Sequence, residues 1–467
     1  MKENLTLFFD DKNILSRNGF TRKLGSPKAI EIYKDPSATT ATGFPSIWHD
    51  EQNGKYHMFY NGHVNGKLVP LAAISDDGIH FSPRNTAEEA GLNNPTAPNQ
   101  VMIGCGELAN VYVDKKGPSS ERLKALVTYG DSKTTRIIND PLYTSPDGIN
   151  WTRQPVQWHN HAAEPGAMCF YNHVIDKHCI IARPDAGVRR VGLIETSDFK
   201  SFSDARLVMT PDSLDEPLAE HYGMPVFPYE NYFIGFLWIY HVPNVRKRKY
   251  YGGTIDAQLV YSYNGTNFNR TLREAFFSKQ KGMIFPSCMY ESTDGKLLVV
   301  ASTCENEHGY FKNNGVIEIY EIRKDGFISL HADDNADLIT IPMLYRGGDI
   351  KVNINAEHCT CALYTDDSDK HPLNLLEHEL LPLEGFSHEE CKAFSGDCLV
   401  WTPKWKEKDV NCLEGRIIYI ELKLKKGDIY SIKGNLTPMM ICDLARYHLH
   451  GSRYHIELKL TKGDMFP

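Results

Sequence analysis

Short apolar runs separated by polar turns fill the first 330 residues of the chain. In the segment FPSIWHDEQNGKYHMFYNG (44–62), two apolar, aromatic-rich stretches lie on either side of a polar turn, which is typical of two antiparallel strands. The same pattern recurs at residues 107–130, 164–184, 221–240 and 282–303. Convincing helical periodicity is scarce in this part of the chain. The pattern therefore predicts an all-β domain built from five similar modules.

A turn motif follows each of these strand pairs. The heptapeptide SPDGINW (145–151) contains Asp-Gly, which supplies the positive φ that a tight turn needs. Related segments are SDDGIHF (75–81), TSDFKSF (196–202), SYNGTNF (262–268) and RKDGF (323–327). Each one follows a third apolar run. We interpret the motif as the turn into the outermost of four strands in each module, with its aromatic residue packed between modules.

Five four-stranded antiparallel sheets close most naturally into a ring, because closure removes exposed sheet edges. The sequence therefore predicts a five-bladed β-propeller over residues 1–330, with functional residues gathered around its central channel. After residue 330, apolar and polar residues alternate between turns, as in EGRIIYIELKLKKGDIYSIKG (414–434). This alternation predicts a C-terminal β-sandwich domain over residues 331–467, which includes a tail whose segment YHIELKLTKGDMFP echoes that run.

Composition narrows the function classes. The net charge of the 467 residues is −8, which gives no reason to expect nucleic acid or an anionic membrane as a partner. No apolar stretch is long enough to span a bilayer, and MKENLTLFFDDKN lacks the apolar core of a signal peptide. The 11 cysteines form no CxxC pair and no zinc-type spacing. We expect a cytoplasmic protein with reduced cysteines and no cofactor.

Several segments resemble one group of carbohydrate-active proteins. They are LFFDDKNI, DAGVRRVGLIETSDFKSFSDARLV, RKDGFISL, LEGFSHEECKAFSGD and KKGDIYSIKG. Together with the predicted domain order, they are similar to family-32-like proteins among the furanosidase-type glycoside hydrolases of families 32 and 68, whose propeller is shared by families 43 and 62. The resemblance implies acids on the first strands of different blades that point into one axial pocket. The spacing of two such carboxyl groups determines whether hydrolysis retains or inverts the anomeric configuration.

The residues at the matching positions depart from that family. In the first blade the family places Asp before Pro, but this chain has Phe44 before Pro45. In the third blade the family has Arg-Asp-Pro, and the match here, Ala-Glu-Pro, retains a carboxylate in Glu164. In the fourth blade the family has Glu-Cys-Pro, and Met224 replaces the acid, with Glu220 shortly before it. Two of the three positions at which the family has an acid therefore lack one in this chain.

Other ionisable residues at strand starts could rebuild a site. We expect Glu164 and Glu107 to share the nucleophile, base or pKa-tuning roles, and Glu220 or Glu307 to donate the proton to the leaving oxygen. The predicted substrate-binding residues are His221, Arg183, Asp185, Asp256, His308, Phe44 and Trp48. Each acid has an alternative interpretation as a turn ligand or a surface group. For Trp48, Trp238 and Tyr240 the alternative is packing between blades.

The leading functional hypothesis is a glycoside hydrolase that cleaves a fructosyl or pentofuranosyl (arabinofuranosyl) linkage in a small carbohydrate. One alternative is a carbohydrate-binding propeller without catalysis, which Phe44 at the acid position favours. Another is phosphorolysis by a family-130-like propeller, in which Arg183, Arg189, Arg190 and His308 would hold phosphate. The sequence leaves open the sugar, the stereochemical outcome, a calcium ion in the channel and the oligomeric state.

Overall fold

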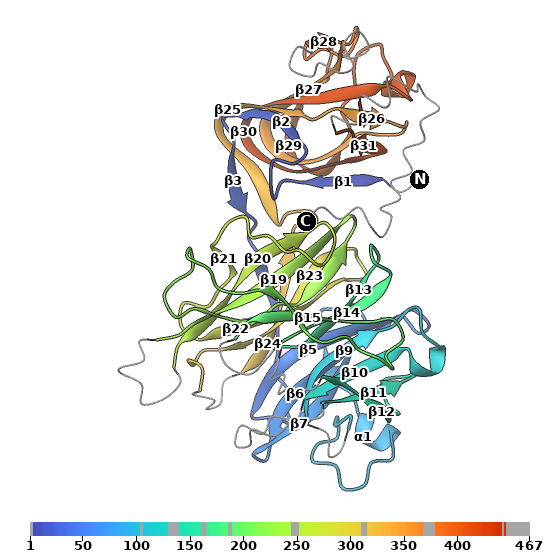
Figure 1. Cartoon of the computed structure of the whole chain (residues 1–467), viewed down its shortest axis with the longest axis vertical. Coiled ribbons are helices and arrows are strands. Elements are labelled where there is room, and N and C mark those ends of the chain that lie inside the picture. The colour runs from blue at the N-terminus through green and yellow to red at the C-terminus, as the bar shows by residue number, and fades with distance from the viewer. Residues whose placement is uncertain are drawn as a thin grey trace. The chain divides into compact units, whose positions relative to one another are not determined.

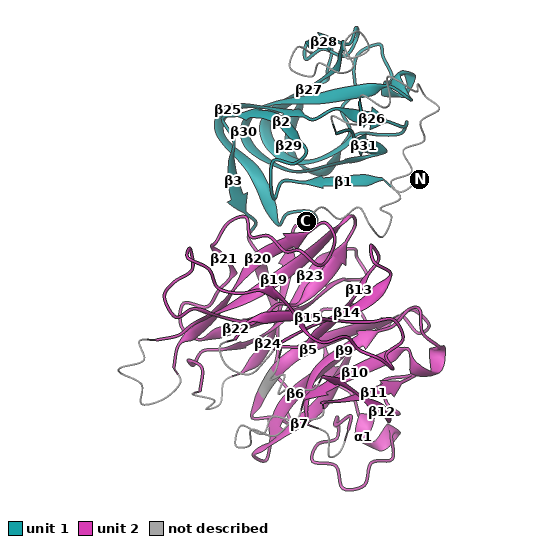
Figure 2. Cartoon of the chain, in the orientation of Figure 1, with its two compact units in different colours: residues 1–25, 324–467 teal, residues 26–323 magenta. Residues whose placement is uncertain are grey.

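The computed structural model describes residues 3–102, 106–128, 140–159, 166–184, 189–243, 252–309, 315–367, 379–440 and 443–444, apart from the side chains of residues 41 and 42. The chain divides into two compact units (Figures 1 and 2). The propeller unit comprises Ser26–Arg323, and the sandwich unit comprises Met1–Gly25 together with Lys324–Pro467.

The propeller unit contains five sets of four antiparallel strands, as the sequence predicts. Blade one consists of β5 (Thr40–Asp50), β6 (Lys55–Val64), β7 (Lys67–Ser75) and β8 (Ser82–Pro83). Blade two consists of β9 (Glu107–Val113), β10 (Leu123–Thr128), β11 (Asp140–Ser145) and β12 (Thr152–His159). Blade three consists of β13 (Met168–Asn172), β14 (Lys177–Ala182), β15 (Val191–Thr196) and β16 (Arg206–Met209). Blade four starts with a split strand, β17 (Glu220–Gly223) and β18 (Val226–Tyr229), followed by β19 (Tyr232–His241), β20 (Thr254–Ser262) and β21 (Ala275–Phe277). Two short helices connect strands, α1 (Thr86–Glu89) and the 3₁₀ turn Ser119–Glu121.

The first strands of the blades surround a common axis. Strand β5 contacts β9, β9 contacts β13, and β13 contacts β18. The circle continues from β19 to β22 (Met283–Glu291), which begins blade five, and returns from β22 to β5. The blades therefore form a closed five-membered ring (Figure 1).

Blade five takes its outermost strand from the N-terminal side of the propeller unit. Strands β22, β23 (Leu297–Cys304) and β24 (Val316–Ile322) are completed by β4 (Lys28–Tyr33), which pairs antiparallel with β24 in the register Ile317↔Tyr33. The junction with blade one is polar and buried: the hydroxyls of Tyr33 and Tyr60 lie 2.8 Å apart, and Asn99 Nδ2 donates to Asp35 over 2.7 Å. This pairing joins the two ends of the propeller unit and removes the free edge of β24.

The repeated motif forms the same turn in blades one to four. In blade two, Ser145 Oγ accepts from Gly148 N at 2.9 Å, and Asp147 Oδ1 accepts from Ile149 N and Asn150 N at 2.9 and 2.8 Å. The motif aromatic Trp151 lies edge-on to Phe59 of blade one, with centroids 5.9 Å apart. The copy at 323–327 is different, because the chain continues from it into the sandwich unit and β4 supplies the outer strand.

The sandwich unit is built on three long antiparallel strands. They are β25 (Ile328–Thr340), β30 (Ile417–Gly434) and β27 (Lys351–Asp366), and β30 pairs with both of the others. Shorter strands complete the sheets: β1 (Asn4–Leu7), β2 (Ile14–Asn18), β3 (Thr21–Leu24), β26 (Met343–Tyr345), β28 (Leu380–Pro382), β29 (Phe394–Trp401) and β31 (Leu436–Pro438). A 3₁₀ turn spans Val410–Leu413. Alternate residues such as Val352, Ile354 and Ile420 are fully buried in one core.

The unit boundaries differ from the predicted division at residue 330. Residues 1–25, expected in the propeller, belong to the sandwich unit, because β1 pairs with β30 and both β2 and β3 pair with β25. The second unit also begins at Lys324, ahead of residue 331. No local pattern in the sequence indicates this exchange, because the pairings join distant residues, as in Ile14↔Thr340 and Asn4↔Gly434. Most of the repeated C-terminal tail, residues 445–467, lies outside the described residues.

Candidate functional site

Polar side chains from blades three, four and five meet around one tyrosine, Tyr222 in β17. We call this group the axial cluster, and its members are Arg183, Arg189, Glu220, Tyr222, Tyr240, Glu307 and His308. Arg183 follows β14 and Arg189 precedes β15, whereas Glu307 and His308 follow β23. These segments are strand ends and loops, which is where propeller-type scaffolds place functional groups.

Two arginines stack on the Tyr222 ring. The guanidinium carbons of Arg183 and Arg189 each lie 5.0 Å from its centroid, and that of Arg189 lies 5.2 Å from the centroid of Tyr240. Arg189 NH1 also donates to Glu220 Oε2 over 2.6 Å, and both side chains are less than one-fifth exposed. Partial burial strengthens this charge-assisted bond, and the stacked rings fix the plane of the guanidinium.

The carboxylate of Glu307 approaches the same aromatic group from blade five. Its Oε2 accepts from Gly253 N over 3.1 Å, and the hydroxyl of Tyr240 donates to the neighbouring Gly252 carbonyl over 2.7 Å. His308 N donates to the Gly253 carbonyl over 2.8 Å, and its ring Nε2 lies 3.2 Å from the Tyr222 hydroxyl. Glu220 and Glu307 therefore lie at the two ends of one chain of contacts that runs through Arg189, Tyr222, His308 and Gly253.

An aromatic layer fills the axis beside the cluster. Phe44 stacks on Trp238 with centroids 4.9 Å apart, and Phe285 meets Phe44 and Tyr222 at 5.6 Å each. Trp238 is completely buried, and a Cβ on Gly223 would come within 2.6 Å of its ring. Phe44, predicted to bind substrate, is 5% exposed, so the structure assigns it to this layer. The position of the expected family acid is thus filled by an apolar ring.

A histidine with two carboxylate partners borders the cluster. His241 Nε2 lies 2.8 Å from Asp256 Oδ2, and its Nδ1 lies 3.0 Å from Glu216 Oε2. The hydrogen bond to Asp256, supported by that to Glu216, raises the pKa of His241 to about 9. His241 is therefore an imidazolium at neutral pH, and Asp256 is the counter-ion of this histidine.

His221 faces away from the cluster. Its ring is completely buried, and its Nε2 lies 3.7 Å from Asp215, which Arg270 binds at 2.6 Å. Burial, assisted by the positive charge of Arg270, lowers the pKa of His221 to about 4. The predicted substrate contact is thus replaced by a neutral histidine in the blade core, whose backbone N donates to the Arg189 carbonyl over 3.1 Å.

The remaining predicted residues are dispersed or outside the description. Glu107 begins β9, where its carbonyl accepts from Thr128 Oγ1 over 3.5 Å. Trp48 stacks on His57 in the core between blades one and two, so it packs the core instead of lining the axis. Glu164 and Asp185 lie outside the described residues.

The cluster and its border also contain residues that the sequence did not single out. Tyr222 is the common contact of both arginines, and His241 is the charged partner of Asp256. The only local signal was their position next to predicted residues, Tyr222 two after Glu220 and His241 directly after Tyr240. Within the described ranges, no three His, Cys, Asp or Glu side chains are placed to hold a metal ion. The described part of the chain also lacks any helix with the length and apolarity needed to cross a membrane.

Comparison with known proteins gives remote structural likenesses only. No protein-family model matches the chain. No curated protein matches it either. Among solved structures, a glycosyl hydrolase from Bacteroides ovatus is 12% identical over 64% of this chain and 94% of its own, with a TM-score of 0.44. A thermostable family-43 glycoside hydrolase is 12% identical over 63% and 95%, with a TM-score of 0.42.

A third structure comes from a study of family 130, described as mannoside phosphorylases that include glycoside hydrolases targeting β-1,2-mannosidic linkages in Candida mannan. It is 15% identical over 65% of this chain and 94% of its own, with a TM-score of 0.42. At such identities and TM-scores these likenesses carry no argument about activity. The propeller assignment comes from the sheet topology, and the functional argument comes from the axial cluster.

Proposed function

We propose that the propeller unit is a glycoside hydrolase whose substrate binds at the axial cluster. The observation that carries the proposal is one chain of contacts that links Glu220 of blade four to Glu307 of blade five through Arg189, Tyr222, His308 and Gly253. Carboxylates from separate blades beside aromatic rings combine the two features that a sugar site needs, namely acid–base groups and a flat surface for the sugar face.

In this proposal, one carboxyl group protonates the leaving oxygen while the glycosidic C–O bond breaks. A water molecule, deprotonated by a second carboxylate, supplies the hydroxyl that adds to the anomeric carbon. Glu307 is the proposed proton donor, because its carboxyl accepts only one hydrogen bond among the contacts above and is exposed to solvent. Glu220 is ion-paired with Arg189 over 2.6 Å. Glu164 and Glu107 remain the predicted nucleophile or base.

A specific observation favours phosphorolysis as the second candidate. Two guanidinium groups stack on one tyrosine ring beside a buried histidine, and planar guanidinium groups bind phosphate in a bidentate manner. In phosphorolysis, a phosphate oxygen takes the place of the water molecule, and the product is a sugar phosphate. The preferred sugars remain fructosyl and pentofuranosyl units.

The experiment that separates these functions is product analysis with purified full-length protein. Aryl-furanosides, fructo-oligosaccharides and manno-oligosaccharides are incubated with and without inorganic phosphate, and the products are identified by mass spectrometry. Release of free sugar at a rate independent of phosphate supports hydrolysis. Strict dependence on phosphate, with a sugar phosphate as product, supports phosphorolysis. Specific binding of a sugar without turnover supports the binding-only alternative and contradicts catalysis.

A further inference from the structure

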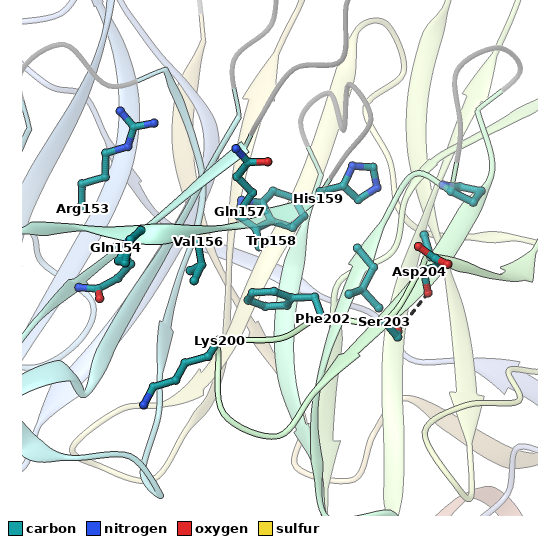
Figure 3. Close-up of a pocket in the computed structure, with 14 residues that line it drawn as sticks. Arg153, Gln154, Val156, Gln157, Trp158, His159, Lys200, Phe202, Ser203 and Asp204 are labelled. Atoms are coloured by element: carbon teal, nitrogen blue, oxygen red, sulfur yellow. Dashed lines mark hydrogen bonds between the residues drawn. The ribbon is translucent and has the colours of Figure 1, made fainter.

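A groove runs between blades two and three, on the flank of the propeller (Figure 3). Its volume is about 840 Å³, which falls within the range of small-molecule binding sites. One wall is formed by all residues from Arg153 to His159 along β12, and the other by Ile194, Lys200 and Phe202–Ala205 of blade three. None of these residues belongs to the axial cluster.

The groove runs along the edge of a sheet. Strand β12 is the last strand of its blade and pairs only with β11 among the described strands, so consecutive residues of both faces line the groove. Pro155 stands in the middle of this edge and has no N–H to donate, and Arg153 places a charge on it. Proline and charged residues on an edge oppose the addition of another strand. The groove is therefore unsuited to an extended peptide.

The side chains of the groove suit a sugar chain instead. Phe202 is a half-buried aromatic ring held against Phe199, with centroids 6.4 Å apart, and offers a fixed apolar surface. Gln154 is oriented by its bond to Thr144 Oγ1 at 2.7 Å, and Gln157 projects from further along the same strand in another direction (Figure 3). An aromatic ring and planar amides along one groove combine stacking with hydrogen bonds to hydroxyl groups.

The charges of the groove select an anionic ligand. Arg153 and Lys200 both line the groove, with their charged groups pointing in opposite directions (Figure 3), and Asp204 is the only acid among its described lining residues. The neighbouring Glu195 is paired elsewhere, with Lys177 at 2.6 Å and Arg206 at 3.6 Å. In the described ranges, neither Arg153 nor Lys200 forms an ion pair with a carboxylate. Each of these cations attracts carboxylates by charge, and arginine also binds them in a bidentate manner.

We propose that this groove binds a segment of an acidic oligosaccharide, with uronic acid carboxylates at Arg153 and Lys200 and a sugar face on Phe202. The site is separate from the axial cluster, although its far end reaches that cluster: His159 Nε2 lies 2.9 Å from the Arg183 carbonyl, and Pro184 lines the groove. An acidic glycan held here would be tethered next to the axial cluster. The proposal does not depend on catalysis.

The test is isothermal titration calorimetry of the full-length protein with a short oligogalacturonide. Its fully methyl-esterified form has the same sugar without the charge, and an oligoglutamate peptide has the charge without the sugar. We expect binding of the acidic sugar, and binding weaker by about tenfold or more for the ester and for the double variant Arg153→Gln/Lys200→Gln. Lys55→Gln, which removes an exposed lysine of blade one paired with Asp76, is the charge-matched control.

Three further results complete the test. Phe202→Ser is expected to weaken the binding of the acidic sugar without altering the stoichiometry. Glu220→Gln is expected to leave the binding of the acidic sugar unchanged. If this variant no longer bound the acidic sugar, the ligand would have to bind at the axial cluster, and the proposal would be overturned. Absence of binding, equal binding of acid and ester, or equal binding of the peptide would overturn it as well. A far-ultraviolet circular dichroism spectrum shows that each variant is folded.

Discussion

Arg189 NH1 lies 2.6 Å from Glu220 Oε2, and the same guanidinium stacks on Tyr222. This pair joins the loop before β15 to the start of β17, and so connects blades three and four at the axis. Because both side chains are less than one-fifth exposed, removal of one charge leaves the other poorly solvated. The pair therefore matters for stability as well as for the site.

The stability of this pair can be measured directly. Glu220→Gln retains the shape of the side chain but removes the charge that faces Arg189, and we expect it to lower the free energy of unfolding by about 1–3 kcal/mol. Urea unfolding at neutral pH gives the value. Glu195→Gln, in a more exposed pair with Lys177, is the matched control, with an expected loss below about 1 kcal/mol. Equal losses for both variants would contradict the assigned burial.

Restoring the family acid at residue 44 is expected to damage the fold. Phe44→Asp would place a carboxylate against Trp238 and Phe285, at a position that is 5% exposed. Burial of an unpaired charge and the loss of the ring together cost about 4 kcal/mol or more. Thermal unfolding followed by tryptophan fluorescence checks this, with Phe44→Leu as the apolar control of smaller effect. A stable Phe44→Asp protein would show that the aromatic layer is incorrectly placed.

The repeated turns make their own contribution to stability. Asp147 accepts two backbone N–H groups and the side-chain amide of Asn150. Asp147→Ala is expected to cost about 1–2 kcal/mol, because those donors lose a charged acceptor. Asp76→Ala, which changes a largely exposed neighbour of the equivalent Asp77 in blade one, is expected to cost less than about 0.5 kcal/mol. Chemical denaturation of the two variants measures both losses, and equal losses would contradict a structural role for Asp147.

The charge of His241 predicts a pH dependence of stability. Its pKa rises from the ordinary value of 6.5 to about 9 on folding, so its stabilising effect is complete below pH 6.5 and disappears as the pH increases towards 9. The difference in unfolding free energy between the protein and His241→Gln should therefore shrink by about 3 kcal/mol between pH 6 and pH 9.5. His358→Gln, exposed on β27, should show no such change. A constant difference for His241→Gln would contradict the pairing with Asp256 and Glu216.

Local patterns in the sequence were sufficient for the blades. Alternating apolar runs and the Ser/Thr-x-Asp/Asn turns predicted four strands per module, and four of the five turns form as expected. Strand β4 was not predicted as the closing strand of blade five, because the segment KAIEIY is short and its partner β24 lies almost 290 residues later. Pairing between distant segments leaves no periodic signal in either one.

The candidate site was predictable only in part. Glu220 was indicated by its strand-start position, Glu307 and His308 by their place after a second strand, and Arg183 by the segment ARPD. The structure places these four near Tyr222 or Tyr240. The same reasoning treated the adjacent residues Glu220 and His221 alike, although neighbouring side chains of a strand point to opposite faces, and the His221 ring lies beside Asp215 in the blade core. It also could not show that Phe44 would stack on Trp238, since that contact joins blades one and four.

The most direct test of the central claim is turnover by Glu220→Gln and Glu307→Gln, compared with Glu195→Gln as the control. The substrate is whichever glycoside the unaltered protein cleaves in the product analysis. The account predicts that each of the two axial variants loses at least about a hundredfold in kcat/KM while remaining folded, and that the control retains its activity. Undiminished turnover in both axial variants, or no cleavage of any glycoside by the unaltered protein, would contradict the account.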